Sequence, residues 1–118
     1  MRHFKKIRTL GRKKAGRTAL LRNLARSLIR DEGLTTTISR AKELRPLVES
    51  LVTKAKQNTI ASRRMVSLRL GGASSATKKL HDTLAPRYLS RAGGYTRIVR
   101  LGPVGKRAIE SARIEFLK

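Results

Sequence analysis

Lysine and arginine are the residues whose number and spacing in this chain could do chemistry, and that chemistry is the binding of phosphate. The 118 residues include 29 Lys and Arg against 7 Asp and Glu, which gives a formal net charge of +22. A monomer with so much charge of one sign repels itself, so the sequence indicates a polyanionic partner. Each phosphate that a cation neutralises releases counterions, so binding should weaken as salt rises.

Residues that could catalyse a reaction or hold a metal are few and scattered. The chain has no cysteine, its seven acids form no metal-binding cluster, and its two histidines are far apart. Neither a GxSxG nucleophile motif nor a GxxxxGK[ST] phosphate loop occurs. We interpret His3 as an RNA or surface contact and His81 as a helix surface residue. The sequence therefore predicts no enzyme, no cofactor, no metal site and no small-molecule substrate.

Two kinds of polyanion fit the charge, a nucleic acid and an anionic membrane surface. A membrane binder needs a basic amphipathic helix with Trp or Phe at its apolar edge. This chain has no Trp, and Phe4 and Phe116 lie at opposite ends. No stretch approaches the roughly 20 apolar residues that span a bilayer. The composition favours a nucleic acid over a membrane, and the lack of cysteine fits a reducing compartment such as the cytoplasm.

The first 17 residues, MRHFKKIRTLGRKKAGR, are predicted to form a basic arm. Residues 1–30 hold 11 Lys or Arg and no acid, and residues 1–17 follow no helical or strand period. We expect the arm to order on its partner, the alternative being a solvated tail. A mitochondrial transit peptide has a similar composition, but this segment continues directly into a predicted helix. The phosphate-binding candidates in the arm are Arg2, His3, Lys5, Lys6, Arg8, Arg12, Lys13, Lys14 and Arg17.

Apolar residues that recur every three or four positions predict four helices. These span residues 18–32, 40–57, 60–70 and 75–84. Thr18 and Ser39 are expected to cap the first two helices, and Gly33 to end the first. Pro46 should either kink the second helix or lie in its first turn, if that helix begins near Glu43. Pro86 should stop the fourth helix.

Residues rich in β-branched and aromatic side chains predict three short strands. The segments are 34–38, 95–101 and 112–117, the last two as an antiparallel hairpin across residues 102–111. Helices on one face of a small three-stranded sheet make an α+β fold. We therefore expect a single compact domain over residues 18–118, with residues 1–17 as a basic N-terminal extension.

RNA is favoured over DNA as the partner, because no helix-turn-helix or zinc-finger pattern is present. A nucleoid-type DNA-binding protein is the alternative. The segment PRYLSRAGGYTR (86–97) combines cations, two tyrosines and a glycine pair. Its tyrosines could stack on unpaired bases or pack in the core. The RNA-binding candidates outside the arm are Arg22, Arg26, Arg63, Arg64, Arg87, Tyr88, Arg91, Gly93, Gly94, Tyr95 and Arg97.

Several blocks of sequence resemble one known family. They are the opening MRH, RTALLRNLARSL (17–28), TTTISRAKELR (35–45), the pair Arg63-Arg64 and APRYLSRAGGYTRI (85–98). Together they resemble the bacterial-type large-subunit ribosomal proteins of family seventeen over nearly the whole chain. The chain departs from that family at residues 13–16, at Pro46 and in the segment LGGASSAT (70–77).

The resemblance implies a structural protein without catalysis. Its partners would be large-subunit ribosomal RNA, near the outer end of the peptide exit tunnel, and neighbouring large-subunit proteins, with no homo-oligomer expected. The protein would stabilise the fold of that RNA in a cytoplasmic ribosome, an organellar one remaining open. The basic extension, with Arg2 and His3, would enter the RNA, and the loop 91–95 would match the family's second specific block.

Overall fold

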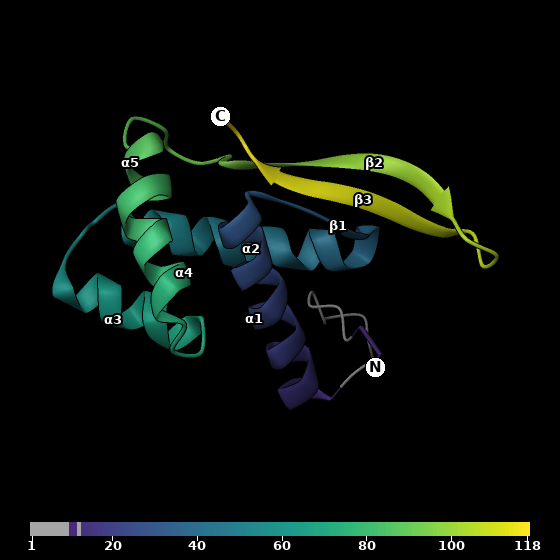
Figure 1. The fold of residues 1–118 in the computed structure, drawn as a ribbon, viewed down its shortest axis with the longest axis horizontal. Helices are drawn as coiled ribbons and strands as arrows, with labels where there is room; N and C mark the ends of the chain where they lie inside the picture. The colour runs from purple at the N-terminus through teal and green to yellow at the C-terminus, as the bar shows by residue number, and fades with distance from the viewer. Residues whose placement is uncertain (1–9, 12) are drawn as a thin grey trace, which may run out of the picture.

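The computed structural model describes residues 10–11 and 13–118 and shows helices packed on one face of a small sheet (Figure 1). The predicted α+β class and three-stranded sheet are confirmed. Along the chain the elements are α1 (Lys14–Asp31), β1 (Gly33–Thr37), α2 (Ile38–Ala55), α3 (Ile60–Arg69), α4 (Ser74–Lys79), η1 (Leu80–Leu84), α5 (Ala85–Arg87), β2 (Thr96–Val104) and β3 (Ile109–Phe116).

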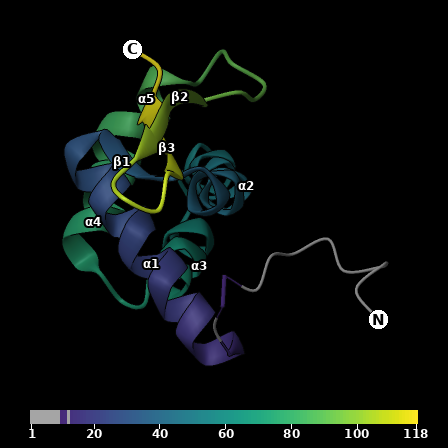
Figure 2. The same cartoon turned by 90° about the vertical axis from the view of Figure 1, so that its right-hand side faces the viewer.

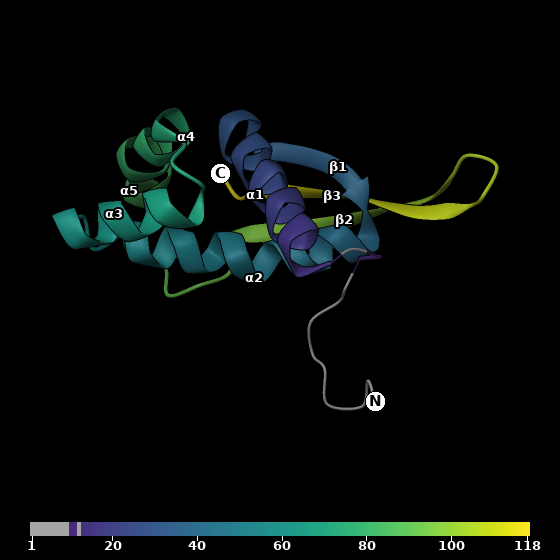
Figure 3. The ribbon, with the colours of Figure 1, turned by 90° about the horizontal axis from the view of Figure 1, so that it is seen from below.

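The sheet is antiparallel, with β3 in the centre of the order β1-β3-β2. The predicted hairpin forms, but β2 runs on through Gly102 and Pro103, which were expected in the turn. A β-bulge between Arg100 and Gly102 makes this possible, because Gly102 adopts a φ of +88° there. Pro103 is tolerated because β2 is an edge strand. The tip of the hairpin projects beyond the helices (Figures 1 and 3).

The core lies between the sheet and the helices, and Figure 1 shows α1 and α2 below the sheet. Figure 2 looks along the axis of α2, which packs against β3. Leu28 and Ile29 of α1 meet Leu44 and Val48 of α2 there, and Ile114 of β3 closes the cluster. These side chains come from the predicted apolar stripes, so helical and strand periodicity identified the core correctly. Burial of such aliphatic side chains is the main stabilising term of the fold.

The first helix begins earlier than predicted. It starts at Lys14 with Lys13 as N-cap residue, so Thr18 is not its cap and the last four residues of the predicted arm are helical. Its end is also one residue early, because Glu32 takes the left-handed conformation (φ +61°) and donates its N–H to the Leu28 carbonyl. Gly33 was expected in that role and instead opens β1.

The second helix begins at Ile38 and contains Pro46 in its interior. Thr37, not Ser39, is the cap, and its side chain accepts a hydrogen bond from the Arg40 backbone at 3.3 Å. The start near Glu43 that the proline suggested is therefore wrong. Pro46 has no N–H, so the carbonyl one helical turn before it lacks its usual donor. Because Pro46 is exposed, water can hydrogen-bond to that carbonyl instead.

Pro86 does not stop the fourth predicted helix. The chain continues from α4 through the π-helical segment η1 into α5, which contains Pro86. The backbone N–H of Ala85 reaches five residues back to the Leu80 carbonyl. The wider π turn relieves the crowding that a proline imposes on the preceding turn, which we take as the reason why the helix survives it.

Candidate nucleic-acid interface

Carboxylates neutralise only a minority of the cations in the described part of the chain. The ion pairs there join seven Lys or Arg to five acids, with N–O distances from 2.6 to 3.8 Å. Six of these seven residues are Arg and one is Lys. The remaining positive charge has to be balanced from outside the folded chain, as a nucleic acid would do.

Arg22 and Arg26 were predicted to contact RNA, and both also hold the fold together. Their Nε atoms donate to the carbonyls of Arg69 and Leu70, at 3.2 and 2.8 Å. These carbonyls end α3, where no further helical N–H is available, so the two arginines cap α3 from α1. Gly71 follows with φ +71°, and a Cβ there would lie 2.4 Å from Arg26 Nη2.

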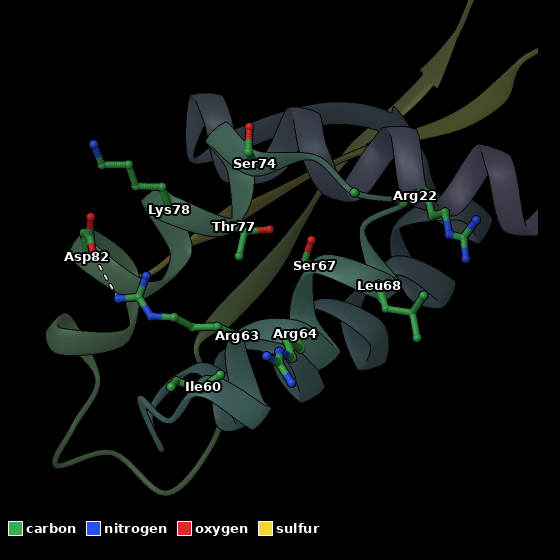
Figure 4. A pocket seen from close by; sticks show the side chains of 12 residues that line it. Arg22, Ile60, Arg63, Arg64, Ser67, Leu68, Ser74, Thr77, Lys78 and Asp82 are labelled. Carbon is green, nitrogen blue, oxygen red and sulfur yellow. Dashed lines mark ion pairs between the residues drawn. The ribbon is translucent and has the colours of Figure 1, made fainter.

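A groove of about 930 Å³ opens between α3 and the α4–η1 segment (Figure 4). Arg22, Arg63, Arg64 and Lys78 line it, as does one acid, Asp82. We call these residues, together with Ile60, Ser67, Leu68, Gly71, Gly72, Ser74 and Thr77, the α3–α4 groove. The groove thus brings together three predicted binding residues, Arg22, Arg63 and Arg64, from two elements far apart in the sequence.

The cations of the groove differ in how they are held. Arg63 reaches across to Asp82 at 3.5 Å, as Figure 4 shows, and to the Asn58 side-chain oxygen at 3.4 Å. The Arg64 side chain is exposed and no carboxylate of the described residues pairs with it in the ion pairs above. Arg63 is therefore oriented by the fold, whereas Arg64 stays free to adapt to a ligand.

Tyr88 and Tyr95 lie in the core, which corrects the stacking role considered for them. Only 3% of Tyr88 and 1% of Tyr95 is exposed, and their ring centroids are 5.2 Å apart. The Tyr88 hydroxyl donates to the Leu117 carbonyl, and Lys56 Nζ donates to the Tyr95 hydroxyl at 3.0 Å. With so few aromatics in the chain, these rings fill core volume and cannot stack on a base in this structure.

Arg87 belongs to an ionic junction instead of an open surface. Its Nη1 lies 2.6 Å from Glu32 Oε1, and Lys79 Nζ lies 3.5 Å from Glu32 Oε2. The hydrogen bond from Arg87 and the charge of Lys79 hold the pKa of Glu32 below its ordinary value. We call Glu32, Lys79 and Arg87 the Glu32 junction. It ties the end of α1 to α4 and α5, and the Phe116 N–H of β3 donates to the Glu32 carbonyl at 3.0 Å.

Arg97 is also paired, with its Nε 3.1 Å from Glu115 Oε1 on the neighbouring strand. Arg91, Gly93 and Gly94 behave differently, since all three are exposed in the loop before β2. A Cβ added at either glycine would meet nothing within 4 Å. This loop is therefore the part of segment 86–97 that stays open to close approach by a partner.

The arm is only partly described. Lys13, Lys14 and Arg17 lie at the start of α1, with both lysines exposed. Arg2, His3, Lys5, Lys6, Arg8 and Arg12 lie outside the described residues.

The sequence reasoning missed Lys78 of the groove and several other exposed cations, among them Arg100, Lys106 and Arg107 of the projecting hairpin. The hairpin cations had a signal in the sequence, a cluster of cations around the turn that follows a predicted strand. His81 is a further correction, because it is buried in η1 instead of lying on a helix surface. Burial lowers its pKa, and the charge of Arg63 lowers it further.

A metal centre and a membrane span are two other kinds of site that the described residues can be checked for. They contain no group of three or more His, Cys, Asp or Glu that could hold a metal ion. Within the same ranges, none of the helices combines the length and the apolar character that crossing a bilayer requires.

Comparison with known proteins agrees with this picture. The family model described as ribosomal protein L17 matches residues 20–117. The chain is 49% identical over 117 residues to the large ribosomal subunit protein bL17 of Sphingopyxis alaskensis, covering 99% of this chain and 84% of that one. The bL17 of Thermomicrobium roseum is 45% identical, with 99% of each chain covered. The chain therefore belongs to the L17 family of ribosomal proteins, which are structural proteins and not enzymes.

Proposed function

We propose that this chain is a structural constituent of the large ribosomal subunit that binds large-subunit ribosomal RNA near the outer end of the peptide exit tunnel. Neighbouring large-subunit proteins would lie beside it, in a ribosome of the cytoplasm. The relatives named above, both called large ribosomal subunit proteins, support the assignment to that subunit. The chain would stabilise the folded RNA by placing cations between strands whose phosphates repel one another.

The observation that carries the proposal is the division of the cations into two groups. One group holds the fold, through carboxylates such as Glu32 and Glu115 and through the carbonyls that end α3. The other is exposed without such partners among the described residues, and it includes Lys13, Lys14 and Arg64. A chain of net charge +22 needs a polyanion to be neutral.

Quantitative mass spectrometry of salt-washed large subunits tests the assignment to the ribosome. We expect the chain at a near-stoichiometric level relative to other large-subunit proteins, and its absence would refute the proposal. Crosslinking followed by RNA sequencing tests the position. Crosslinks should concentrate in the RNA around the outer end of the exit tunnel, and an even distribution along the RNA would contradict this location.

A competition experiment separates this proposal from a nucleoid-type DNA-binding protein. A ribosomal RNA fragment that contains the crosslinked region should displace labelled RNA far better than duplex DNA of equal charge. Equal competition by the two would favour the DNA-binding alternative. Affinity for both should fall with salt, with a slope of about −0.7 to −0.9 for each phosphate contact.

The arm can be tested without damage to the first helix. Deletion of residues 1–12 removes six of the predicted contacts and leaves α1, which begins at Lys14, whole. We expect an unchanged circular dichroism spectrum and thermal midpoint, because the core lies beyond the deletion. Incorporation into large subunits should weaken. Global unfolding of the truncated chain would contradict the division into arm and domain.

A further inference from the structure

We propose that the α3–α4 groove binds an unpaired nucleotide of RNA, with the base on the aliphatic side chains of α3 and the flanking phosphates at the cations around them. The proposal rests on the function proposed above and names the kind of RNA feature that one part of the surface would recognise.

The floor of the groove is aliphatic and open. Ile60 and Leu68 are 71% and 73% exposed, among the most exposed large apolar residues in the described chain. They are eight positions apart, with Arg64 between them, so all three lie on the same side of α3. Both line the groove. Exposed apolar side chains such as these gain free energy when a ligand covers them.

The rim of the groove is cationic. Arg22, Arg63, Arg64 and Lys78 surround the floor, against the single carboxylate of Asp82, which already pairs with Arg63. Arg22 is held by the carbonyl of Arg69. Guanidinium groups that the fold orients beforehand lose less conformational entropy on binding, and their planar shape suits phosphate. The charge of the rim therefore complements the phosphates on either side of a nucleotide.

Hydroxyl groups give the groove a third kind of contact. Ser67 of α3 and Thr77 of α4 face the space between the two helices (Figure 4). Thr77 Oγ1 donates to the Ala73 carbonyl at 2.8 Å, so it can accept a further hydrogen bond but not donate one. Base edges and 2′-hydroxyls supply the donors that such an oxygen accepts.

An unpaired nucleotide fits these three features better than a duplex does. A duplex presents phosphates and sugars, while its base faces are stacked inside, so Ile60 and Leu68 would stay uncovered. An extruded base brings a flat apolar face that packs between apolar side chains, with a phosphate on each side. An acidic amphipathic peptide has related chemistry, and the experiment below includes it.

The test uses the full-length chain and two blunt-ended RNA duplexes of the same sequence, one fully paired and one with a single unpaired uridine in one strand. Fluorescence anisotropy at several salt concentrations gives Kd for each RNA. We expect the bulged RNA to bind about fivefold more tightly, which is the low end of what a base gains by stacking on an aromatic side chain, because the side chains here are aliphatic. Equal affinity for the two RNAs would overturn the proposal.

The double substitution Ile60→Ser with Leu68→Ser removes the floor and leaves every cation in place. It should abolish the preference for the bulged RNA, while Kd for the paired RNA stays the same. Leu89→Ser is the matched control, since Leu89 is 64% exposed and lies outside the groove. It should keep the preference. A double variant that weakens binding to both RNAs equally would overturn the proposal.

Two outcomes identify other errors. If a peptide of alternating Glu and Leu binds more tightly than the bulged RNA, and the double variant loses that binding, the groove fits a protein partner and the nucleotide proposal is overturned. If the chain binds neither RNA duplex more tightly than a DNA duplex of the same length, the proposed function itself fails. That second result can be distinguished from failure of the groove proposal alone, in which the chain prefers RNA to DNA but binds the paired and bulged RNAs equally.

Discussion

The Glu32 junction and the α3–α4 groove use the same residue types for opposite purposes. In the junction, Arg87 and Lys79 surround one carboxylate, and Arg87 also lies over the ring of Tyr88, 5.9 Å from its centroid. In the groove, four cations share the one carboxylate of Asp82, and aliphatic side chains stay exposed beside them. Both cations of the junction have an ion-pair partner within the chain, whereas in the groove only Arg63 has one among the ion pairs above.

This difference shows that a cation's role follows from what packs around it, not from its type or its place in a basic sequence. Arg87 and Arg97 lie in the same basic segment as Arg91, yet carboxylates of other elements, the C-cap of α1 and the strand β3, neutralise the first two. Glu32 is 55 residues away from Arg87 in sequence. Interface candidates on such a chain are therefore best sought where carboxylates are lacking.

The largest expected contrast is between an apolar residue of the core and one of the groove. Leu44→Ala empties a fully buried position and should lower the free energy of unfolding by about 2–5 kcal/mol. Leu68→Ala should change it by less than about 0.5 kcal/mol, since that side chain is mostly exposed. Chemical denaturation measures both. A large loss from Leu68→Ala would mean that the groove residue stabilises the fold.

Glycine substitutions beside the groove should have the next largest effect. Gly71 and Gly72 both have positive φ, +71° and +82°, but a Cβ at Gly71 would displace Arg26, while one at Gly72 meets nothing within 4 Å. Gly72→Ala should lower the free energy of unfolding by about 1–2 kcal/mol through backbone strain. Gly71→Ala should cost about 1 kcal/mol more, as Arg26 loses its bond to Leu70. Equal losses would show that the Arg26 anchor contributes nothing.

Removing the carboxylate of the junction should have a smaller effect. Glu32→Gln leaves Arg87 and Lys79 unneutralised and should lower the free energy of unfolding by about 1 kcal/mol near neutral pH. Because folding lowers the pKa of Glu32 from 4.5, the wild type should lose this contribution as pH falls below that value. The variant should lack that part of the pH dependence.

Asp31→Asn is the matched control for the junction. Asp31 pairs only with its sequence neighbour Arg30 among the ion pairs above, and both side chains are more than half exposed. Its substitution should leave stability nearly unchanged, in denaturation curves recorded at the same pH values as those of Glu32→Gln. A similar loss from both variants would show that general charge, not the junction, is responsible.

The sequence predicted the core well and the caps and interface poorly, for a physical reason. Apolar periodicity is a local property, so the helix and the strand that contribute Leu44 and Ile114 to the core were predicted from neighbouring residues along the chain. The buried positions of Tyr88 and His81, and the pairing of Arg87, depend on contacts between distant elements. The helix that passes Pro86 needs a π turn, which leaves no distinctive local pattern.

The α3–α4 groove is likewise a product of the fold, because Arg22 and Arg64 meet only when α1 and α3 pack together. The pair Arg63-Arg64 was visible in the sequence as a basic site. The sequence did not show that Ile60 and Leu68 would be exposed beside this pair, since an apolar residue on a helix is ordinarily assigned to the core.

The smallest expected effect links the groove to the core through Arg63. His81 is buried beside Arg63. Burial is the main cause that lowers the pKa of its imidazole, and the charge of Arg63 is the second. The Ala55 backbone and the charge of Asp82 act in the opposite direction. Since folding lowers this pKa from 6.5, the protein should lose stability as pH falls through that value. Histidine NMR titration follows the group directly.

Arg63→Gln should raise the pKa of His81, because it removes a nearby positive charge and frees Asp82 from its ion pair. Arg64→Gln is the control, since Arg64 is not among the causes of the shift. Anions at the groove should act in the same direction as Arg63→Gln, because they offset the charge that His81 senses. If neither Arg63→Gln nor bound RNA changes the pKa of His81, the core and the groove are electrostatically independent. Burial would then be the sole cause of the lowered pKa.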